Sequence, residues 1–516
     1  MPITKYLISD LDQSISRFDL EIQAAKGATL LSTYGVKHDD RVAIIMRNDL
    51  TSCEVMRAIA LAGAVAVQIN WHGTKSEIFD ILEDCKPTLI IIHRDLISKI
   101  KVKNCNYLII GVTPPKALQL AYKTDSQEII KTGNITEWSL LRDEMVPIVN
   151  DTYMRPMMRY TSGSTGKPKG IIRVKKPDKN GPIDYYKTLR FTATKMFSFT
   201  PGAHFMTAAP LYHSGPSTLS SMAIAMEEMS VTILPRFDPI KFLEAIENYR
   251  VTHIYLVPTM MIRLLKLPKK IRQKYDISSV KFCVSTGSPW PHEVKASMID
   301  WWGPVFWETY GASELGFLTL VSSQESIDRP GTVGRIQLGG SIKIYDTNKT
   351  ELPMGQVGDI YIKTDAFGQF HYSNDVGSNQ KLEIDDYISV GDMGWLDEDG
   401  YLFVTNRKKD MIISGGVNIF PAEIEEILFK APFIADVAVF GAPDPEFGEQ
   451  IVAAIQPVES WTENETEIIE WLEGKIAHFK HPKIIKFHKK LPREDSGKIF
   501  KTRLRAPYWT KLDRSI

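Results

Sequence analysis

The chain has 516 residues, of which 43% are apolar, and its 62 lysines and arginines balance 62 aspartates and glutamates. This length exceeds what one hydrophobic core usually supports, so we expect two or more domains. A net charge of zero argues against a nucleic acid or a membrane surface held by bulk electrostatics. The ligand is therefore expected in a local pocket.

Cysteine usage and the first residues predict a cytoplasmic protein. Cys53, Cys85, Cys105 and Cys283 are scattered and form no metal-ligand pattern, as is usual in a reducing compartment. Met1–Lys5 lack the charged and apolar regions of a signal peptide. Because no apolar run approaches the roughly 18 residues of a membrane span, we expect no transmembrane segment.

Apolar runs alternate with helix-length segments from residue 41 onward, which predicts βαβ units and a parallel sheet. The expected strands are Val42–Met46, Val65–Ile69, Leu89–Ile92, Leu108–Val112, His253–Val257 and Val280–Ser285. The expected helices are Cys53–Ala64, Ser76–Cys85 and Lys241–Tyr249. The large N-terminal region is thus predicted to be α/β, with parallel or mixed sheets and packed helices.

The pattern changes after about residue 340. Half-buried strands are expected at Ser341–Tyr345 and Asp359–Lys363, and a tight turn at Asp397–Gly400 precedes the strand Tyr401–Thr405. These strands predict a small barrel-like β part at the end of the N-terminal region.

A small α+β unit is expected beyond the basic segment 406–410. Pro421 suits the first turn of a helix whose inner face carries Ile424, Ile427, Leu428 and Ala431. A second helix is predicted to start near Thr462, with a capping box to Glu465 and an inner stripe of Ile468, Leu472, Ile476 and Phe479. We therefore expect domains at residues 1–408 and 409–516.

One glycine-rich stretch carries the strongest functional signal. It runs Thr161-Ser162-Gly163-Ser164-Thr165-Gly166-Lys167-Pro168-Lys169-Gly170. Its glycines let backbone N–H groups approach a phosphate, and its hydroxyls and lysines add donors and positive charge. The glycine-to-lysine spacing differs from that of the P-loop of nucleotide hydrolases. A plain surface loop is the alternative, because such residues are common in loops.

This decapeptide resembles the phosphate-binding signature of the adenylate-forming enzymes: acyl-CoA synthetases, luciferases and peptide-synthetase adenylation domains. Further stretches resemble that family in the same chain order. The segment Glu308-Thr309-Tyr310-Gly311-Ala312-Ser313-Glu314 is similar to the pattern Tyr-Gly-x-Thr-Glu, with Ser313 in place of threonine. By this resemblance Tyr310 stacks on adenine and Glu314 is the Mg²⁺ ligand.

Four weaker matches gain weight from their order. His213 falls where the family lines its acyl pocket, although a lone histidine is more often structural. The turn Ser285–Pro289, with Gly287, resembles the border of the adenine and acyl sites. Asp392 resembles the carboxylate that binds both ribose hydroxyls, and Arg407 is expected to pair with phosphate or ribose oxygens.

The remaining matches concern the second half-reaction. Lys409 falls at the family's hinge residue, about which a mobile C-terminal domain rotates. Gly415 and Gly416 resemble the segment that a pantetheine arm approaches. Lys498, in a Pro-x-x-x-x-Gly-Lys motif, resembles the catalytic lysine that bridges the substrate carboxylate and the α-phosphate, although a single C-terminal lysine is otherwise usually just solvated.

The resemblance implies an acyl-CoA synthetase that uses ATP, Mg²⁺ and coenzyme A to activate a hydrophobic carboxylic acid. Two alternatives stay open: a ligase that loads an acyl carrier protein, and a nucleotide sensor without catalysis. No nucleic-acid partner is expected, and the oligomeric state, a homodimer included, is open. The acid itself is not defined by the sequence.

Overall fold

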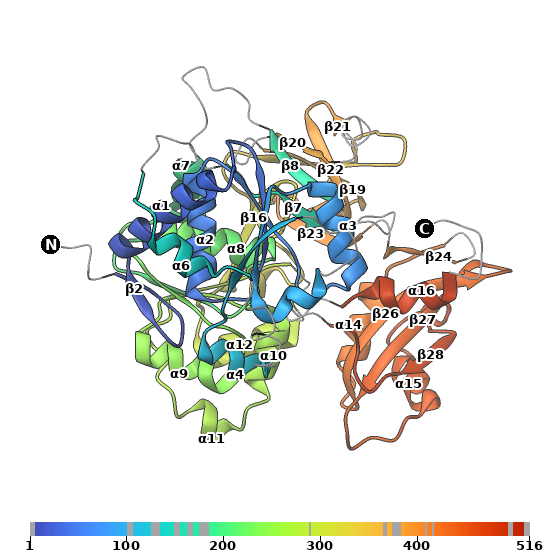
Figure 1. The fold of residues 1–516 in the computed structure, drawn as a ribbon. Helices are drawn as coiled ribbons and strands as arrows, with labels where there is room; N and C mark the ends of the chain where they lie inside the picture. The colour runs from blue at the N-terminus through green and yellow to red at the C-terminus, as the bar shows by residue number, and fades with distance from the viewer. Residues whose placement is uncertain are drawn as a thin grey trace.

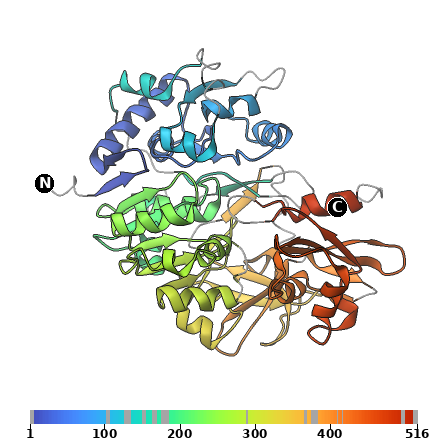
Figure 2. The same cartoon turned by 90° about the horizontal axis from the view of Figure 1, so that it is seen from below.

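The structure is a computed structural model of the chain. It describes residues 6–100, 107–124, 129, 135–148, 155–161, 169–174, 185–287, 290, 292–364, 369–373, 383–407, 410–414, 417–493 and 499–509. In Figures 1 and 2 the N-terminal region runs from blue through green and yellow to light orange, and the C-terminal part is drawn in deeper orange and red.

A four-stranded parallel sheet confirms the predicted βαβ units. Its order is β4 (Val65–Gln68), β3 (Arg41–Ile45), β5 (Leu89–His93) and β6 (Leu108–Val112). Helices α2 (Leu50–Leu61) and α3 (Lys75–Cys85) connect these strands. The strand β5 is buried along its whole length, as expected of a central parallel strand.

A larger, nine-stranded sheet forms the middle of the N-terminal region. Its order is β17 (Arg335–Ile336), β16 (Thr319–Ser322), β13 (Phe306–Glu308), β12 (Phe282–Ser285), β11 (His253–Tyr255), β9 (His204–Thr207), β10 (Ser230–Ile233), β1 (Leu7–Ser9) and β2 (Ser14–Ser16). The segment from β13 to β10 is parallel. The predicted strands at 253–257 and 280–285 are thus confirmed, each slightly shorter than expected.

Helices surround these two sheets, and their bounds follow. They are α1 (Arg17–Thr33), η2 (Arg94–Lys99), α4 (Lys116–Tyr122), α6 (Trp138–Asp143), α7 (Tyr185–Phe197), α8 (Ser214–Ala225), α9 (Pro239–Tyr249), α10 (Pro258–Leu265), α11 (Lys269–Arg272), α12 (His292–Trp302) and α13 (Ser323–Asp328). The predicted helix at 241–249 is α9, extended to Pro239 because Asp238 caps its first turn.

Two smaller sheets follow. In the first, β18 (Ser341–Tyr345), β19 (Gly358–Lys363), β22 (Tyr387–Leu396) and β21 (Glu383–Ile384) are antiparallel, and β23 (Leu402–Arg407) pairs with β22. This sheet is the predicted barrel-like β part. In the second, β20 (Gln369–Tyr372), β8 (Lys169–Val174) and β7 (Arg159–Thr161) form a three-stranded sheet. A short hairpin, β14 (Gly311–Ala312) and β15 (Gly316–Phe317), stands apart.

The C-terminal part has its own sheet and its own core. The sheet order is β25 (Val417–Ile419), β24 (Ile412–Ser414), β27 (Gly448–Pro457) and β26 (Ile434–Asp444), with β28 (Ile484–Phe487) parallel to β27. Helices α14 (Pro421–Phe429), α15 (Glu465–Leu472) and α16 (Lys501–Trp509) cover it, and Figure 1 shows them around the sheet. The α+β prediction is confirmed, whereas the domain boundary after residue 408 stays a prediction.

The predicted second helix of this part was placed too early and made too long. Asn464, not Thr462, is its N-cap, and the Asn464 side chain accepts a hydrogen bond from the backbone N–H of Thr466 at 3.1 Å. The helix ends at Leu472 because Gly474 takes a positive φ of 69°. Ile468 and Leu472 are buried as expected, but Phe479 lies beyond the helix and is 57% exposed.

Candidate functional site

Two of the predicted stretches meet at the carboxyl ends of neighbouring parallel strands. Ser285 at the end of β12 is in register with Glu308 at the end of β13. The backbone N–H of Thr309 donates to the carbonyl of Ser285 at 3.0 Å, and the Thr286 hydroxyl donates to the carbonyl of Thr309 at 2.6 Å. Ligands of open α/β sheets bind outside such strand ends. The structure therefore brings the segments around Gly287 and Tyr310 to one edge.

Tyr310 connects this edge to the barrel-like sheet. Its hydroxyl donates to the Oδ2 atom of Asp392 at 2.6 Å, although the two residues are 82 positions apart. Asp392 is 5% exposed and lies on β22, where its backbone is in register with Arg407 on β23. The residues predicted for adenine and ribose are thus neighbours in space.

Glu314 lies within a small buried network. It is 9% exposed, and its Oε1 atom accepts a hydrogen bond from the Tyr372 hydroxyl on β20 at 3.1 Å. Burial and the neighbouring Glu314 raise the pKa of the Tyr372 phenol, which keeps this donor protonated. Arg173 on β8 donates to the carbonyl of Ser313 at 3.1 Å. Burial lowers the pKa of Arg173, while the charge of Glu314 opposes that shift.

The predicted phosphate-binding stretch connects β7 and β8 near this network. Thr161 and Lys169 are paired across the two antiparallel strands. The ammonium of Lys169 lies 5.4 Å from the centroid of the Tyr372 ring, which is a cation–π distance. The same tyrosine holds Glu314, so one end of the stretch lies next to the proposed metal ligand.

His213 and the start of α8 approach from another side. The Ser214 hydroxyl at the first position of α8 lies 3.3 Å from the Ser313 hydroxyl. A side chain added at Gly215 would place a Cβ 3.2 Å from both Thr286 and Tyr255, so α8 packs tightly on the β12 turn. The positive end of a helix dipole therefore points toward this region, which favours an anion. The His213 ring, at 4.3 Å between centroids, packs on Tyr212.

Glu308 has a different role from the other predicted residues. Its carboxylate accepts a hydrogen bond from Lys295 on α12 at 2.5 Å, and both side chains are buried. Burial raises the pKa of Glu308, and the Lys295 ammonium opposes that shift. This buried ion pair uses the Oε2 atom of the Glu308 carboxylate and ties the end of β13 to α12. Gly311 is required sterically, because a Cβ there would lie 2.2 Å from the carbonyl oxygen of Gly316.

Several predicted residues lie outside the described part of the chain. They are Ser162, Gly163, Ser164, Thr165, Gly166, Lys409, Gly415, Gly416 and Lys498. Their roles stay predictions, as do the side-chain roles of Thr161 and Arg407. The sequence reasoning missed Tyr372 and Arg173, for which neither motif nor spacing gave a signal, and it gave no role to Ser214, which directly follows His213.

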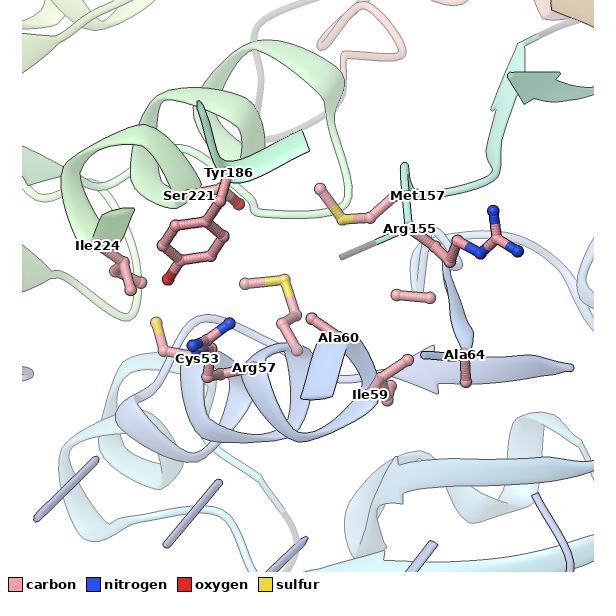
Figure 3. Close-up of a pocket in the computed structure, with 12 residues that line it drawn as sticks. Cys53, Arg57, Ile59, Ala60, Ala64, Arg155, Met157, Tyr186, Ser221 and Ile224 are labelled. Carbon is pink, nitrogen blue, oxygen red and sulfur yellow. The ribbon is translucent and has the colours of Figure 1, made fainter. Parts of the chain in front are cut away.

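The pocket drawn in Figure 3 is separate from these residues. It lies between α2 and α8 and is lined mostly by apolar groups such as Met56, Ile59 and Met157. Its free volume of about 30 Å³ suits a water molecule rather than a substrate. Met222 and Met229 on the α8 side of the molecule are fully buried in the main core, and Met226 is partly buried against it.

No helix in the described part of the chain combines the length and the apolar character that crossing a bilayer requires. The three cysteines that the structure describes are buried free thiols. Burial raises the pKa of each of them, as expected of structural rather than reactive cysteines.

Known proteins of this fold are similar along nearly the whole chain. An indoleacetate–CoA ligase of Aromatoleum aromaticum is 29% identical over 483 residues, which cover 93% of this chain and 90% of that protein. A long-chain-fatty-acid–CoA ligase of Bacillus subtilis is 28% identical over 521 residues, which cover 97% of this chain and 91% of that protein. The crystal structure of ATP-bound MatB from Rhodopseudomonas palustris is 26% identical, with a TM-score of 0.81, and the match covers 98% of this chain and 97% of that one.

Two family models match the sequence itself. The model of the AMP-binding enzyme matches residues 2–369, and that of the AMP-binding enzyme C-terminal domain matches residues 423–498. Together with the neighbouring Tyr310, Asp392 and Glu314 segments, these matches show that the chain belongs to the AMP-binding enzyme family, the adenylate-forming enzymes.

Proposed function

We propose that the protein is an AMP-forming carboxylic acid–CoA ligase. In the first half-reaction an oxygen of the substrate carboxylate attacks the α-phosphorus of ATP, and pyrophosphate leaves. In the second, the CoA thiolate attacks the carbonyl carbon of the acyl-adenylate, and AMP leaves. The observation that carries this proposal is the convergence of Tyr310, Asp392 and Glu314 beside the ends of β12 and β13.

Binding of the nucleotide follows from that convergence. The ring of Tyr310 offers a face for adenine, and its hydrogen bond fixes the carboxylate of Asp392 for the ribose hydroxyls. The hydroxyls and backbone N–H groups of the 161–166 stretch, with Lys169, would hold the phosphates. The position of Lys169 beside Tyr372 supports this arrangement.

Glu314 suits a magnesium ion that is shared with ATP. Mg²⁺ binds proteins through one or two carboxylates and otherwise through phosphates and water. Tyr372 hydrogen-bonds the Oε1 atom of Glu314, which orients the carboxylate and leaves lone pairs for a metal. The ion would neutralise phosphate charge while two anions meet at the α-phosphorus.

Two lysines would have different roles in the two half-reactions. Lys498 would bridge the substrate carboxylate and the α-phosphate during adenylation. Rotation about Lys409 would then exchange Lys498 for the Gly415-Gly416 face and admit the pantetheine thiol. The separate sheet and core of the C-terminal part support an independently moving domain.

The acid is proposed to be hydrophobic and to lack an amine. Two relatives are named for indoleacetate and for long-chain fatty acids, which share a carboxylate on an apolar body. Near the first turn of α8 the side chains of Tyr212, His213 and Trp71 form an aromatic group that suits such a body.

CoA-dependent release of AMP from ATP, measured across fatty, aryl and polycyclic acids, tests the proposal. Turnover that requires both one of these acids and CoA supports the ligase. Acid-dependent ATP–pyrophosphate exchange without CoA-dependent turnover would overturn the CoA step and favour a carrier-protein acceptor. Nucleotide binding with neither activity would leave only a sensor.

A further inference from the structure

A turn in the C-terminal part places two histidines and a glutamate together. The 3₁₀ helix η5 (His478–Lys480) follows α15, and His481 is its C-cap. Side chains three residues apart eclipse each other in a 3₁₀ helix, so His478 and His481 lie on the same side. Their ring centroids are 5.1 Å apart. Glu473 lies at the end of α15, where the chain turns back toward them.

The three side chains are close enough to share a metal ion. One ligand atom from each of Glu473, His478 and His481 lies within 4.8 Å of the other two, and no other set of three such residues in the described ranges does so. Tetrahedral zinc ligands, at 2.0 to 2.1 Å from the metal, are about 3.3 Å apart. Glu473 and His478 are exposed, so small side-chain rotations can close the remaining distance.

His481 provides an independent reason to expect a ligand. Its side chain is only 7% exposed, yet neither ring nitrogen has a hydrogen-bond partner among the residues that the structure describes. Buried polar atoms are almost always paired, and such exceptions need an explanation. A metal ion bound to one nitrogen would supply the missing partner.

The neighbouring cations are occupied elsewhere. The ammonium of Lys480 donates to both carboxylate oxygens of Glu423 at 2.7 Å. The ammonium of Lys475 donates to the carbonyl of Trp471 at 2.6 Å. Neither lysine therefore uses the carboxylate of Glu473, which stays available to a metal.

We infer that Glu473, His478 and His481 bind a divalent transition metal, with zinc as the best fit and water completing the coordination. Two imidazoles and one carboxylate suit zinc and its neighbours, whereas Mg²⁺ prefers oxygen ligands alone. The ion would connect the end of α15 to the turn before β28 and so stabilise the C-terminal part. This site is distinct from Glu314 and does not depend on the proposed reaction.

The test measures zinc binding to the full chain without ATP, in millimolar Mg²⁺ to saturate oxygen sites. Calorimetry should give one equivalent of Zn²⁺, and Co²⁺ should give the visible absorption of a tetrahedral site. We expect His478→Ala and Glu473→Gln to weaken binding by at least ~10-fold, as even outer-shell changes do. Both residues are exposed, so both variants should fold.

His292→Ala is the matched control, because His292 is an exposed histidine on α12. It should bind zinc like the unchanged chain. Zinc should also raise the Tm of the unchanged chain and of His292→Ala, but not that of His478→Ala. Absence of stoichiometric binding, or equal affinity in His478→Ala, overturns the inference.

Discussion

The hydroxyl of Tyr310 donates to Asp392 at 2.6 Å and thereby connects the edge of the nine-stranded sheet to the barrel-like sheet. Asp392 is buried, so its charge needs such partners in the absence of a nucleotide. The same hydrogen bond sets the direction in which the remaining carboxylate oxygen points. Adenine binding and ribose binding are therefore expected to be coupled through one side chain.

Tyr310→Phe should raise the KM for ATP while leaving kcat nearly unchanged. The variant keeps the aromatic face but removes the donor, and a hydrogen bond to a charged group contributes about 1.5–3 kcal/mol. We expect a KM increase of about tenfold or more, measured by ATP–pyrophosphate exchange. Tyr401→Phe is the control, because the Tyr401 hydroxyl also donates to a carboxylate, that of Glu325 at 2.7 Å, in another part of the chain. An unchanged KM in Tyr310→Phe would contradict the assignment.

Glu314→Gln should slow adenylation and weaken its response to Mg²⁺. An amide keeps the shape and can still accept from Tyr372, but it lacks the charge that a hard cation requires. Loss of one preorganised electrostatic group costs on the order of 10²–10³ in rate. Rates of pyrophosphate exchange over a magnesium titration measure the effect. Glu351→Gln, at an exposed glutamate paired with Lys343, should behave like the unchanged enzyme. Equal magnesium dependence in both variants would refute the role of Glu314.

Lys498→Ala should separate the two half-reactions. The activation barrier of adenylation should rise by about 2–4 kcal/mol, by analogy with the loss of one preorganised donor. Conversion of supplied acyl-adenylate and CoA to thioester should continue, because Lys498 is not needed once the adenylate exists. Stopped assays of each half-reaction measure this difference, with the exposed Lys490→Ala as the control. If the rates of adenylation and of thioester formation fell by the same factor, the assignment of Lys498 to adenylation alone would be wrong.

The sequence predicted secondary structure well wherever the spacing of apolar residues and the residues that start or end an element indicated the same helix or strand. Helix α14 begins at Pro421 and buries Ile424 and Leu428 because its apolar spacing and its first-turn proline point to the same helix. The predicted N-cap of α15 was wrong because Thr462 and Asn464 are both good N-cap residues, and the side chain that accepts the first-turn hydrogen bond is that of Asn464.

The site was predictable in its motifs but not in its supporting contacts. Tyr310 and Glu314 belong to one short stretch, so their chemistry could be inferred together. Their partners Asp392 and Tyr372 come from distant strands, and only the folded sheets bring them into contact. The pairing of Glu308 with Lys295 depends likewise on how α12 packs against β13. Such contacts are properties of the tertiary structure.

Because the His253 side chain is buried, we expect the protein to lose stability at low pH. His253 is 4% exposed on β11, its Nε2 lies 3.0 Å from the carbonyl of Ser198, and its ring stacks on Phe282. The pKa of His253 is lowered to about 4, mainly by burial; the hydrogen bond to Ser198 opposes this shift, and the charge of Lys281 adds to it. An unfolded histidine titrates near a pKa of about 6.5.

The unfolded chain therefore binds a proton at this residue before the folded chain does. The contribution of His253 to the free energy of unfolding is fully present above pH ~6.5 and is lost as the pH falls toward ~4. At 1.36 kcal/mol per pKa unit, the loss is on the order of 3 kcal/mol. Urea unfolding at several pH values measures this slope. His253→Gln, which can still donate to Ser198 but does not titrate, should show a shallower slope, whereas the exposed His292→Gln should keep it. Equal slopes in the two variants would show that another group causes the acid instability.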